Sequence, residues 1–297
     1  MKTGSRTGQT RHLKAGSHER QVLLIIVAVL SVLRMTPAAH AESNWNLSAD
    51  AGFLVANTYL GSSEHYVTPV PEIRATRQSG STTWFIGLPL DGFGVSHRNA
   101  RSGLLTSLRA NFGNRRRHDE YSVLGFSVEH DERTLARLAG TPDVTTPMVL
   151  EARLQYPTRL GVLETALGYH PINTTFEQKD REEINRHGFV LRLQYLLPVQ
   201  VSNALTITGL TSLGLMDSSY AQGWFALDQE TKALTRFEAG AGLRDYQAAL
   251  HVNYRVSSEF SLTLYYSETI LTGDAADSPY TVDRHQQTFL FRTAYSF

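Results

Sequence analysis

Apolar and polar side chains alternate along much of this chain with a period of two residues. In residues 287–297, Phe289, Phe291, Tyr295 and Phe297 fall on one face, and Arg292 falls on the other. The same alternation recurs in the following segments: 45–55, 148–156, 187–195, 247–254 and 259–267. Each run is about ten residues long, which suits a tilted strand that crosses a bilayer, whereas soluble strands are mostly five or six residues.

One face of each run is almost free of charge, as expected for strands whose outer face meets lipid. A soluble sandwich gives the same alternation with the two sides reversed. The strand length and the terminal Phe297 favour a barrel, and Phe297 is expected to serve barrel assembly. The pattern therefore predicts an all-β fold, a transmembrane antiparallel up-and-down β-barrel.

About twelve segments fit this strand pattern. They lie near residues 45–56, 66–77, 81–88, 101–113, 120–130, 147–156, 160–170, 186–197, 203–213, 243–255, 259–271 and 286–297. An even number returns both termini to the periplasmic side, as in single-chain bacterial barrels. Two segments fit least, namely 81–88, which runs into Pro89, and 120–130, so ten strands are the alternative.

The connections between these strands alternate between short and long. Residues 78–80, 157–159 and 257–258 suit periplasmic turns. Longer stretches suit outer loops: 57–65, 131–146, 171–185, 214–242 and 272–285.

The first 41 residues differ from the rest of the chain. A basic start precedes the twelve-residue apolar run 22–33, and Ala39-His40-Ala41 supplies a small-x-small cleavage site. Twelve residues span only about 18 Å as a helix, too short for a membrane core of about 30 Å. We expect a signal peptide over residues 1–41 and an outer-membrane β-barrel domain over residues 42–297.

Charge and cysteine content exclude several classes of protein. Without residues 1–41, 22 basic and 27 acidic residues are left, a net charge of about −5. A nucleic-acid binder would instead show a concentrated basic surface. The chain has no Cys, so neither a disulfide framework nor thiol chemistry is available.

Three stretches resemble the MipA/OmpV family, also called the MltA-interacting protein family. The first runs from Tyr59 through Gly61 and Ser62 to the Pro69-x-Pro71 strand. The second comprises Asp217-Ser-Ser-Tyr220 and the following Ala239-Gly-Ala-Gly-Leu-Arg244. The third, Leu271-Thr-Gly273-Asp274-Ala-Ala-Asp277-Ser278-Pro279, is the most specific. Residues 113–145, with the basic run 115–117, are less similar and are interpreted as an insertion.

These motifs have structural roles first. Gly61 and Gly273 permit positive φ in tight loops. Asp274, Asp277 and Ser278 can cap their own turns, and the last residue of the motif, proline, fixes the exit angle. Cation or partner binding by the two aspartates is the alternative, although two acids three residues apart offer too few oxygens for a calcium site.

Catalytic and metal-binding patterns are missing from the sequence. The eleven His residues are scattered, and no His-Glu-x-x-His, Walker or Gly-x-Gly-x-x-Gly motif occurs. His170 with Glu164, and His251 with Ser261, are pairs that no spacing supports as a hydrolase site. We expect no enzyme activity, no cofactor and no metal.

The predicted strand phases direct charged side chains of both signs into the lumen. These are Glu72, Arg74, Arg109, Glu151, Arg153, Glu164, Arg192, Glu259 and Arg292. Crowded charges of mixed sign favour mutual ion pairs, because unpaired ones would be costly. We expect a largely plugged interior, with a selective solute pore as the alternative.

The family resemblance implies an outer-membrane scaffold of a Gram-negative bacterium, surrounded by outer-membrane lipid. On this reading the partners are a lytic transglycosylase and a murein synthase, enzymes of peptidoglycan turnover. The alternative is a small-solute channel, or a surface receptor or adhesin that acts through outer loops. The aromatic loop 214–234, with Tyr220, Trp224 and Phe225, is the feature that would serve an adhesin.

Overall fold

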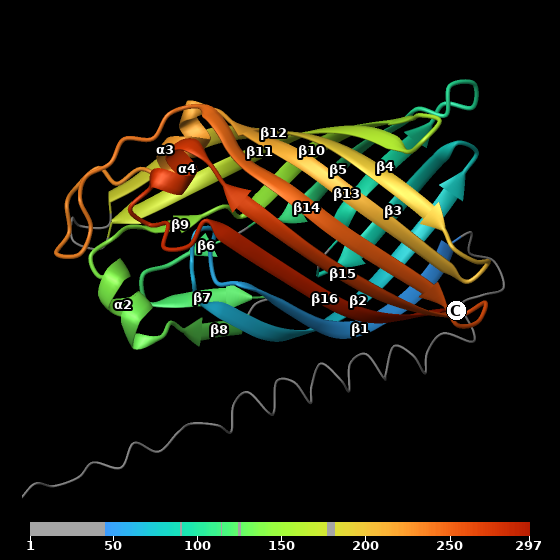
Figure 1. The fold of residues 1–297 in the computed structure, drawn as a ribbon, viewed down its shortest axis with the longest axis horizontal. Helices are drawn as coiled ribbons and strands as arrows, with labels where there is room; N and C mark the ends of the chain where they lie inside the picture. The colour runs from blue at the N-terminus through green and yellow to red at the C-terminus, as the bar shows by residue number, and fades with distance from the viewer. Residues whose placement is uncertain (1–44, 90, 114, 124–125, 177–181) are drawn as a thin grey trace, which may run out of the picture. The chain divides into compact units, whose positions relative to one another are not determined.

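The computed structural model describes residues 45–297 except 90, 114, 124–125 and 177–181. Twelve antiparallel strands form a closed barrel (Figure 1), as the alternation predicts, and the ten-strand alternative is excluded. In order around the wall they are β1 (Trp45–Asn57), β2 (His65–Ser79), β3 (Thr82–Leu88), β4 (Gly92–Arg98), β5 (Leu105–Phe112), β10 (Met148–Pro157), β11 (Val162–Phe176), β12 (Glu182–Gln200), β13 (Leu205–Met216), β14 (Gly242–Arg255), β15 (Phe260–Leu271) and β16 (His285–Ser296). The predicted signal peptide lies outside the described residues.

The first and last strands close the barrel. β1 pairs with β16 from Ser48 opposite Ser296 to Ala56 opposite Thr288. On the outer face of the seam, the ring of Phe53 lies 5.7 Å from the rings of both Phe289 and Phe291. These aromatic cross-strand contacts reinforce the backbone pairing along the seam.

One predicted strand is wrong and one strand was missed. Residues 120–130 form the small hairpin of β7 (Glu120–Val123) and β8 (Phe126–Glu129), which pair with each other and not with the wall. The twelfth wall strand is instead β4, which pairs with β3 and β5. Its two glycines and its length of seven residues hide the alternation that longer strands show.

Short turns gather at one end of the barrel and long loops at the other (Figure 1). The predicted turns near 78–80, 157–159 and 257–258 lie at the short-turn end, together with turns 99–104 and 201–204. The loop end carries β6 (Arg115–Arg116), β9 (Asp143–Thr145) and the helices α2 (Glu132–Leu138), α3 (Ser218–Trp224) and α4 (Gly273–Asp277). The predicted outer loop 171–185 is largely wrong, because β11 and β12 extend into it to Phe176 and from Glu182.

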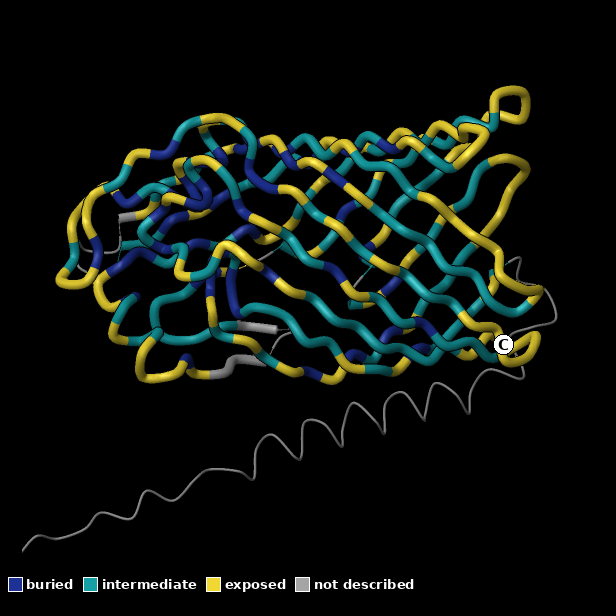
Figure 2. The backbone as a smooth tube through the Cα atoms, in the orientation of Figure 1, coloured by how far each residue is buried: buried dark blue, intermediate teal, exposed yellow. Residues whose placement is uncertain are grey.

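Burial in the wall is the reverse of that in a soluble protein. The outward faces expose large apolar side chains, including Trp84, Leu108 and Phe189, whereas the inward-facing Glu72 and Glu164 are each 1 % exposed. Exposed and buried positions alternate along the strands in Figure 2. An apolar outer band around a polar interior is the arrangement of a barrel that spans a membrane.

Among the described residues, no helix has both the length and the apolar character needed to cross a membrane.

Candidate functional site

The lumen near the β1–β16 seam is filled by a network of ion pairs. Arg292 Nη1 lies 2.5 Å from Glu72 Oε2 and 3.4 Å from Asp50 Oδ2. Arg74 lies beside the same Glu72 and bonds Asp91. The carboxylates of Asp50 and Glu72 are almost fully buried, so their pairing with arginine offsets the cost of removing them from water. We call Asp50, Glu72, Arg74, Asp91 and Arg292 the seam network.

A second network lies on the neighbouring arc of the wall. Arg109 Nε donates to Glu151 Oε1 at 2.6 Å, and Arg153 donates to the same oxygen. Arg153 Nη1 also lies 3.3 Å from Glu164 Oε1. Glu164 further accepts bonds from Gln155 and Gln194. Apart from Glu259, the charges predicted to face inward do so, and each has an oppositely charged side chain beside it.

Glu259 is the exception among those predicted lumen charges. It lies fully exposed in the turn between β14 and β15, where Ser257 and Ser258 donate to its carboxylate. The hydrogen bond from Ser258, followed by that from Ser257, lowers the pKa of this carboxyl. The prediction failed because the strand begins one residue later, at Phe260.

Loops fold back over the other end of the barrel. We call them the loop cover, meaning residues 58–64, 115–123, 126–146, 217–241 and 272–284. Their buried side chains form two apolar clusters, one around Tyr220, Trp224 and Phe225 and the other around Tyr59 and Tyr280. Tyr220, Trp224 and Phe225 are therefore not the exposed aromatic surface that an adhesin loop would need.

The first family motif contacts the residues that follow the third motif. The Gly61 N–H donates to Gln286 Oε1 at 3.0 Å, and its carbonyl accepts from Val282 N at 2.7 Å. Gly61 has a φ of 99° and Gly273 a φ of 52°, a region that glycine adopts at little cost. The Ser62 hydroxyl is buried between Thr58 and the backbone N–H of Glu64.

The third motif forms α4 and the turn that follows it. Asp274 Oδ2 accepts from Gly240 N at 2.6 Å, and the exposed Asp277 pairs with Arg284 at 2.9 Å. Ser278 Oγ donates to the Phe225 carbonyl at 2.7 Å, and the Pro279 carbonyl accepts from Arg137 at 2.6 Å. These contacts connect α4 to α2 and α3.

The remaining motif residues lie in the wall or beneath the cover. Pro69 and Pro71 belong to β2 and lie opposite Phe53 and Ala51 of β1. Tyr220 belongs to α3, whose first turn Asp217 caps by accepting from Tyr220 N at 2.7 Å. Phe297 follows β16, and its N–H donates to the Leu47 carbonyl at 3.0 Å.

Arg116 joins the loop segments, a role that sequence reasoning missed. Its guanidinium carbon lies 3.5 Å from the centre of the Tyr280 ring, and Nη1 donates to the Trp224 carbonyl. The side chain is 3 % exposed. Burial lowers the pKa of the Arg116 guanidinium and raises the pKa of the Tyr280 hydroxyl. Its one sequence signal was the basic run 115–117 in the segment interpreted as an insertion.

His130 fixes the hairpin β7–β8 to the loop after β1. Its side chain is 1 % exposed, and Nδ1 lies 2.6 Å from Glu64 Oε2. The other ring nitrogen lies 3.2 Å from the carbonyl of Arg117, and the Asp131 N–H donates to Glu64 Oε1 at 2.9 Å. Glu64 lies inside the first family motif, which therefore anchors the less similar segment 113–145.

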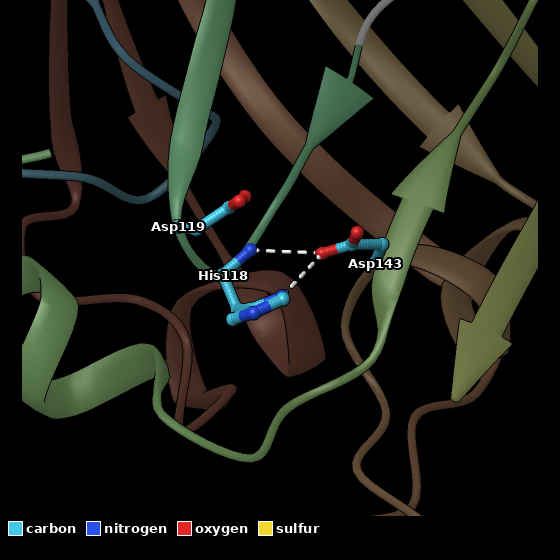
Figure 3. A group of neighbouring side chains, drawn as sticks. All are labelled: His118, Asp119 and Asp143. Atoms are coloured by element: carbon cyan, nitrogen blue, oxygen red, sulfur yellow. Dashed lines mark hydrogen bonds and ion pairs between the residues drawn. The ribbon is translucent and has the colours of Figure 1, made fainter. Parts of the chain in front are cut away.

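Three potential metal ligands lie together at the edge of the cover. His118, Asp119 and Asp143 offer ligand atoms within 4.8 Å of one another (Figure 3). Asp143 Oδ1, however, accepts from the His118 N–H and lies 2.9 Å from its Nδ1. The Arg117 guanidinium lies 3.4 Å from Asp143 and 3.5 Å from Asp119, so both carboxylates already have a cation beside them. The group is a salt-bridge cluster, and we assign no metal to it.

A chamber of about 740 Å³ lies inside the barrel beneath the loop cover. Its wall includes Tyr66, Glu151, Arg153, His170, Val190, Arg192, Arg244, Gln247 and Tyr265, and its upper boundary includes Tyr59, Arg115, Tyr220 and Trp224. The chamber is large enough to hold a small molecule.

A β-bulge buries two consecutive charged residues at this chamber, and the first of them, Arg244, lines it. Gly214 pairs with Asp245 and Leu215 with Leu243, so Arg244 is the extra residue on β14. Both Arg244 and Asp245 are consequently buried, at 8 % and 0 % exposure, and they pair with each other. A Cβ at Gly214 would lie 2.8 Å from the Asp245 carboxylate oxygens, so glycine makes room for them. Strict alternation would have turned one of the two outward.

A family model described as MltA-interacting protein MipA matches residues 50–297. The chain belongs to the MipA family. The family and the barrel fold are those of outer-membrane proteins of Gram-negative bacteria.

Solved structures similar to this MipA-family chain are also outer-membrane barrels. The translocator domain of the autotransporter NalP from Neisseria meningitidis aligns with a TM-score of 0.46 and 11 % identity, over 94 % of this chain and 96 % of that one. An outer membrane channel from Pseudomonas putida F1 aligns with a TM-score of 0.46 and 10 % identity, over 88 % and 98 %. At these TM-scores the similarities carry no information on function. No curated protein matches the chain.

Proposed function

We propose that this chain is a non-catalytic interaction protein of the outer membrane that holds peptidoglycan-processing enzymes at the membrane. The observation that carries the proposal is the family match over residues 50–297, because the family is named for an interaction with MltA, a lytic transglycosylase. A murein synthase is the second expected partner. On this proposal the barrel anchors the enzymes and takes no part in their chemistry.

The filled lumen supports an interaction role over free diffusion through the barrel. Glu72 and Glu164, in the two ion-pair networks, are almost fully buried among the side chains that surround them. Packed, paired charges leave little room for water at this level. The two ends of the barrel then become the surfaces through which it can act.

The short-turn end has the charge needed to recognise an anionic protein surface. It comprises residues 77–81, 97–104, 157–161, 200–204 and 255–259, which we call the turn rim. Its exposed charged side chains are Arg77, Arg98, Arg101, Arg159, Arg255 and Glu259. Five arginines against one acid contrast with the chain without residues 1–41, which has net negative charge. Both barrel termini lie at this end, which faces the periplasm in single-chain bacterial barrels.

Site-specific photo-crosslinking in cells tests the proposal. A photoreactive residue at Ser102 or Ser258 in the turn rim should capture a lytic transglycosylase, identified by mass spectrometry. The same residue at Glu230, exposed at the loop end, is the matched control and should not. The scaffold proposal is wrong if no rim position captures a peptidoglycan enzyme from cells that contain the folded barrel.

Charge reversal at the rim sharpens the same test. Replacing Arg98 and Arg101 by Glu should reduce capture at Ser258 about tenfold, because close opposite charges steer and hold the partner. Arg236→Glu, at an exposed position in the loop cover, is the control. Heat-modifiable migration on a gel verifies that each variant has folded.

A small-solute channel is the second candidate, and the chamber of about 740 Å³ is the observation that favours it. The seam network and its neighbour should prevent steady ion flow, so planar bilayers that contain the protein are expected to show no stable conductance. Stable conductance that changes in Glu72→Ala would favour the channel. A receptor role of the outer loops would show as lost surface binding after residues 226–238 are deleted.

A further inference from the structure

The chamber has an excess of positive charge on one side. Arg192 of β12 and Arg244 of β14 share a single carboxylate, that of Asp245 on β14. Glu151, the acid in the chamber wall, already accepts from both Arg109 and Arg153. One positive charge of the Arg192–Asp245–Arg244 group is therefore not balanced within that group.

The two arginines of this group differ in how firmly they are held. Arg244 is buried, donates to Asp245 through Nε, and donates through Nη1 to the Tyr220 hydroxyl at 3.1 Å. Arg192 is more open, with 28 % of its side chain exposed inside the barrel. Its Nη1 donates to Gln247 Oε1 at 2.9 Å, but its nearest Asp245 oxygen is 3.7 Å away. A guanidinium has five N–H donors, so Arg192 can donate to a further acceptor.

Part of the chamber wall is apolar, which is unusual for a barrel lumen, and some of this apolar surface flanks Arg192 directly. Inward-facing aliphatic side chains there come from β1, β10, β11, β12 and β13: Leu54, Ala56, Val149, Ala166, Val190 and Leu210. Ion pairs that only fill the lumen would not need an apolar surface beside them. Aliphatic side chains around a cavity favour the apolar part of a ligand, and a single charged group fixes its orientation.

We propose that the chamber is a binding site for a small amphiphilic carboxylate. The carboxylate lies against the Arg192 guanidinium as a charge-assisted, two-bonded pair, and the hydrocarbon part lies against Val190, Ala166 and Leu54. Asp245 and Gln247 hold Arg192 in position, at 3.7 and 2.9 Å. Binding at this site needs no partner enzyme, so its test is independent of the test of the scaffold role.

Octanoate is the probe, and Trp224 in the upper chamber boundary is the reporter. The full chain carries Trp45→Phe and Trp84→Phe, which removes the other two tryptophans. It is refolded into neutral phosphatidylcholine nanodiscs with the probe present, so that entry through the loop cover is not limiting. Trp224 emission should shift saturably with octanoate, and octylamine or octanol should require at least ten times the concentration.

Variants of the cation decide whether the chamber is the site. Arg192→Gln should weaken octanoate binding at least tenfold, and Arg192→Lys should weaken it less, because charge is kept and the paired geometry is lost. Arg284→Gln, an exposed cover arginine, should bind octanoate like the parent. Equal responses to octanoate, octanol and octylamine would show that the shift in Trp224 emission comes from partition of the probes into lipid, and would overturn the proposal. An unchanged affinity in folded Arg192→Gln would also overturn it.

Discussion

The seam network and the loop cover both close the lumen, but they do so by different means. The seam network consists of charged side chains on one arc of the wall, and its two buried carboxylates pair with Arg292, which lies one strand away from Asp50 and two strands away from Glu72. The loop cover consists of aromatic clusters held by a few polar contacts, such as Arg116 on Tyr280. Strand alternation is sufficient to build the first. The second requires loops distant in sequence to fold onto one another.

The largest expected effect lies in the seam network. Glu72→Ala leaves Arg74 and Arg292 without their shared carboxylate, and should reduce the free energy of unfolding by about 3–5 kcal/mol. Urea unfolding in phospholipid vesicles, followed by heat-modifiable migration, measures this loss. Glu268→Ala is the matched control, because this exposed carboxylate pairs with His285 and should lose less than about 1 kcal/mol. Equal losses would show that the seam network is not a special source of stability.

The loop cover should respond locally to a comparable change. Arg116→Met keeps the side-chain length but removes the cation above Tyr280 and the bond to the Trp224 carbonyl. We expect the cover to lose about 1–3 kcal/mol of docking energy, while the wall stays folded. Hydrogen exchange of the α2 amides should accelerate about tenfold or more, and that of β14 should not change. Arg115→Met, at the exposed neighbour, should leave both unchanged.

The end of β16 offers a smaller test on the side of the wall. Deleting Phe297 removes its N–H bond to Leu47 and its ring contact with Tyr295, at 5.1 Å. The purified barrel should lose about 1 kcal/mol. If Phe297 also serves assembly, as the sequence suggests, the assembled fraction in cells should fall more than this loss explains. Phe297→Tyr should restore both, and equal losses in cells and in vesicles would contradict an assembly role.

The smallest effect concerns the first turn of α2. Asp131 accepts from the Thr134 N–H at 2.7 Å, and this backbone bond lowers the pKa of the carboxyl. A lowered pKa means that the stabilisation is complete above the unfolded value of about 3.9 and is lost as the pH falls through the folded value. Asp131→Ala should cost about 0.5–1 kcal/mol near neutral pH, read from exchange of the Thr134 amide. Asp131→Asn should keep most of the cap and lose its pH dependence.

The sequence predicted the wall better than the loop cover for a physical reason. Strand alternation is local, so Arg292, Glu72 and Glu151 could be directed inward from their neighbours alone. The β-bulge that turns both Arg244 and Asp245 inward breaks this alternation, so the alternation could not predict it. The contacts of Arg116 and His130 depend on which loops meet across the mouth, which no periodicity encodes.

Errors in strand assignment have the same origin. Residues 120–130 contain enough β-branched and aromatic residues for a strand, but they form a hairpin away from the wall. The β4 strand is short and contains Gly92 and Gly94, so its pattern was too brief to recognise. Strand length identifies a membrane-spanning strand when the run is about ten residues long, but it cannot distinguish a short wall strand from a strand of a loop hairpin.

The pairing of Arg292 with Glu72 also bears on how the barrel is made. These residues are 220 positions apart, and the arginine belongs to the last strand. Until β16 joins β1, Asp50 lacks its arginine partner and Glu72 has only Arg74, on its own strand. Both carboxylates must then remain in contact with water. Closing the seam and removing these two carboxylates from water therefore happen in the same step. An incomplete sheet therefore keeps unpaired charges in contact with water along its open edge.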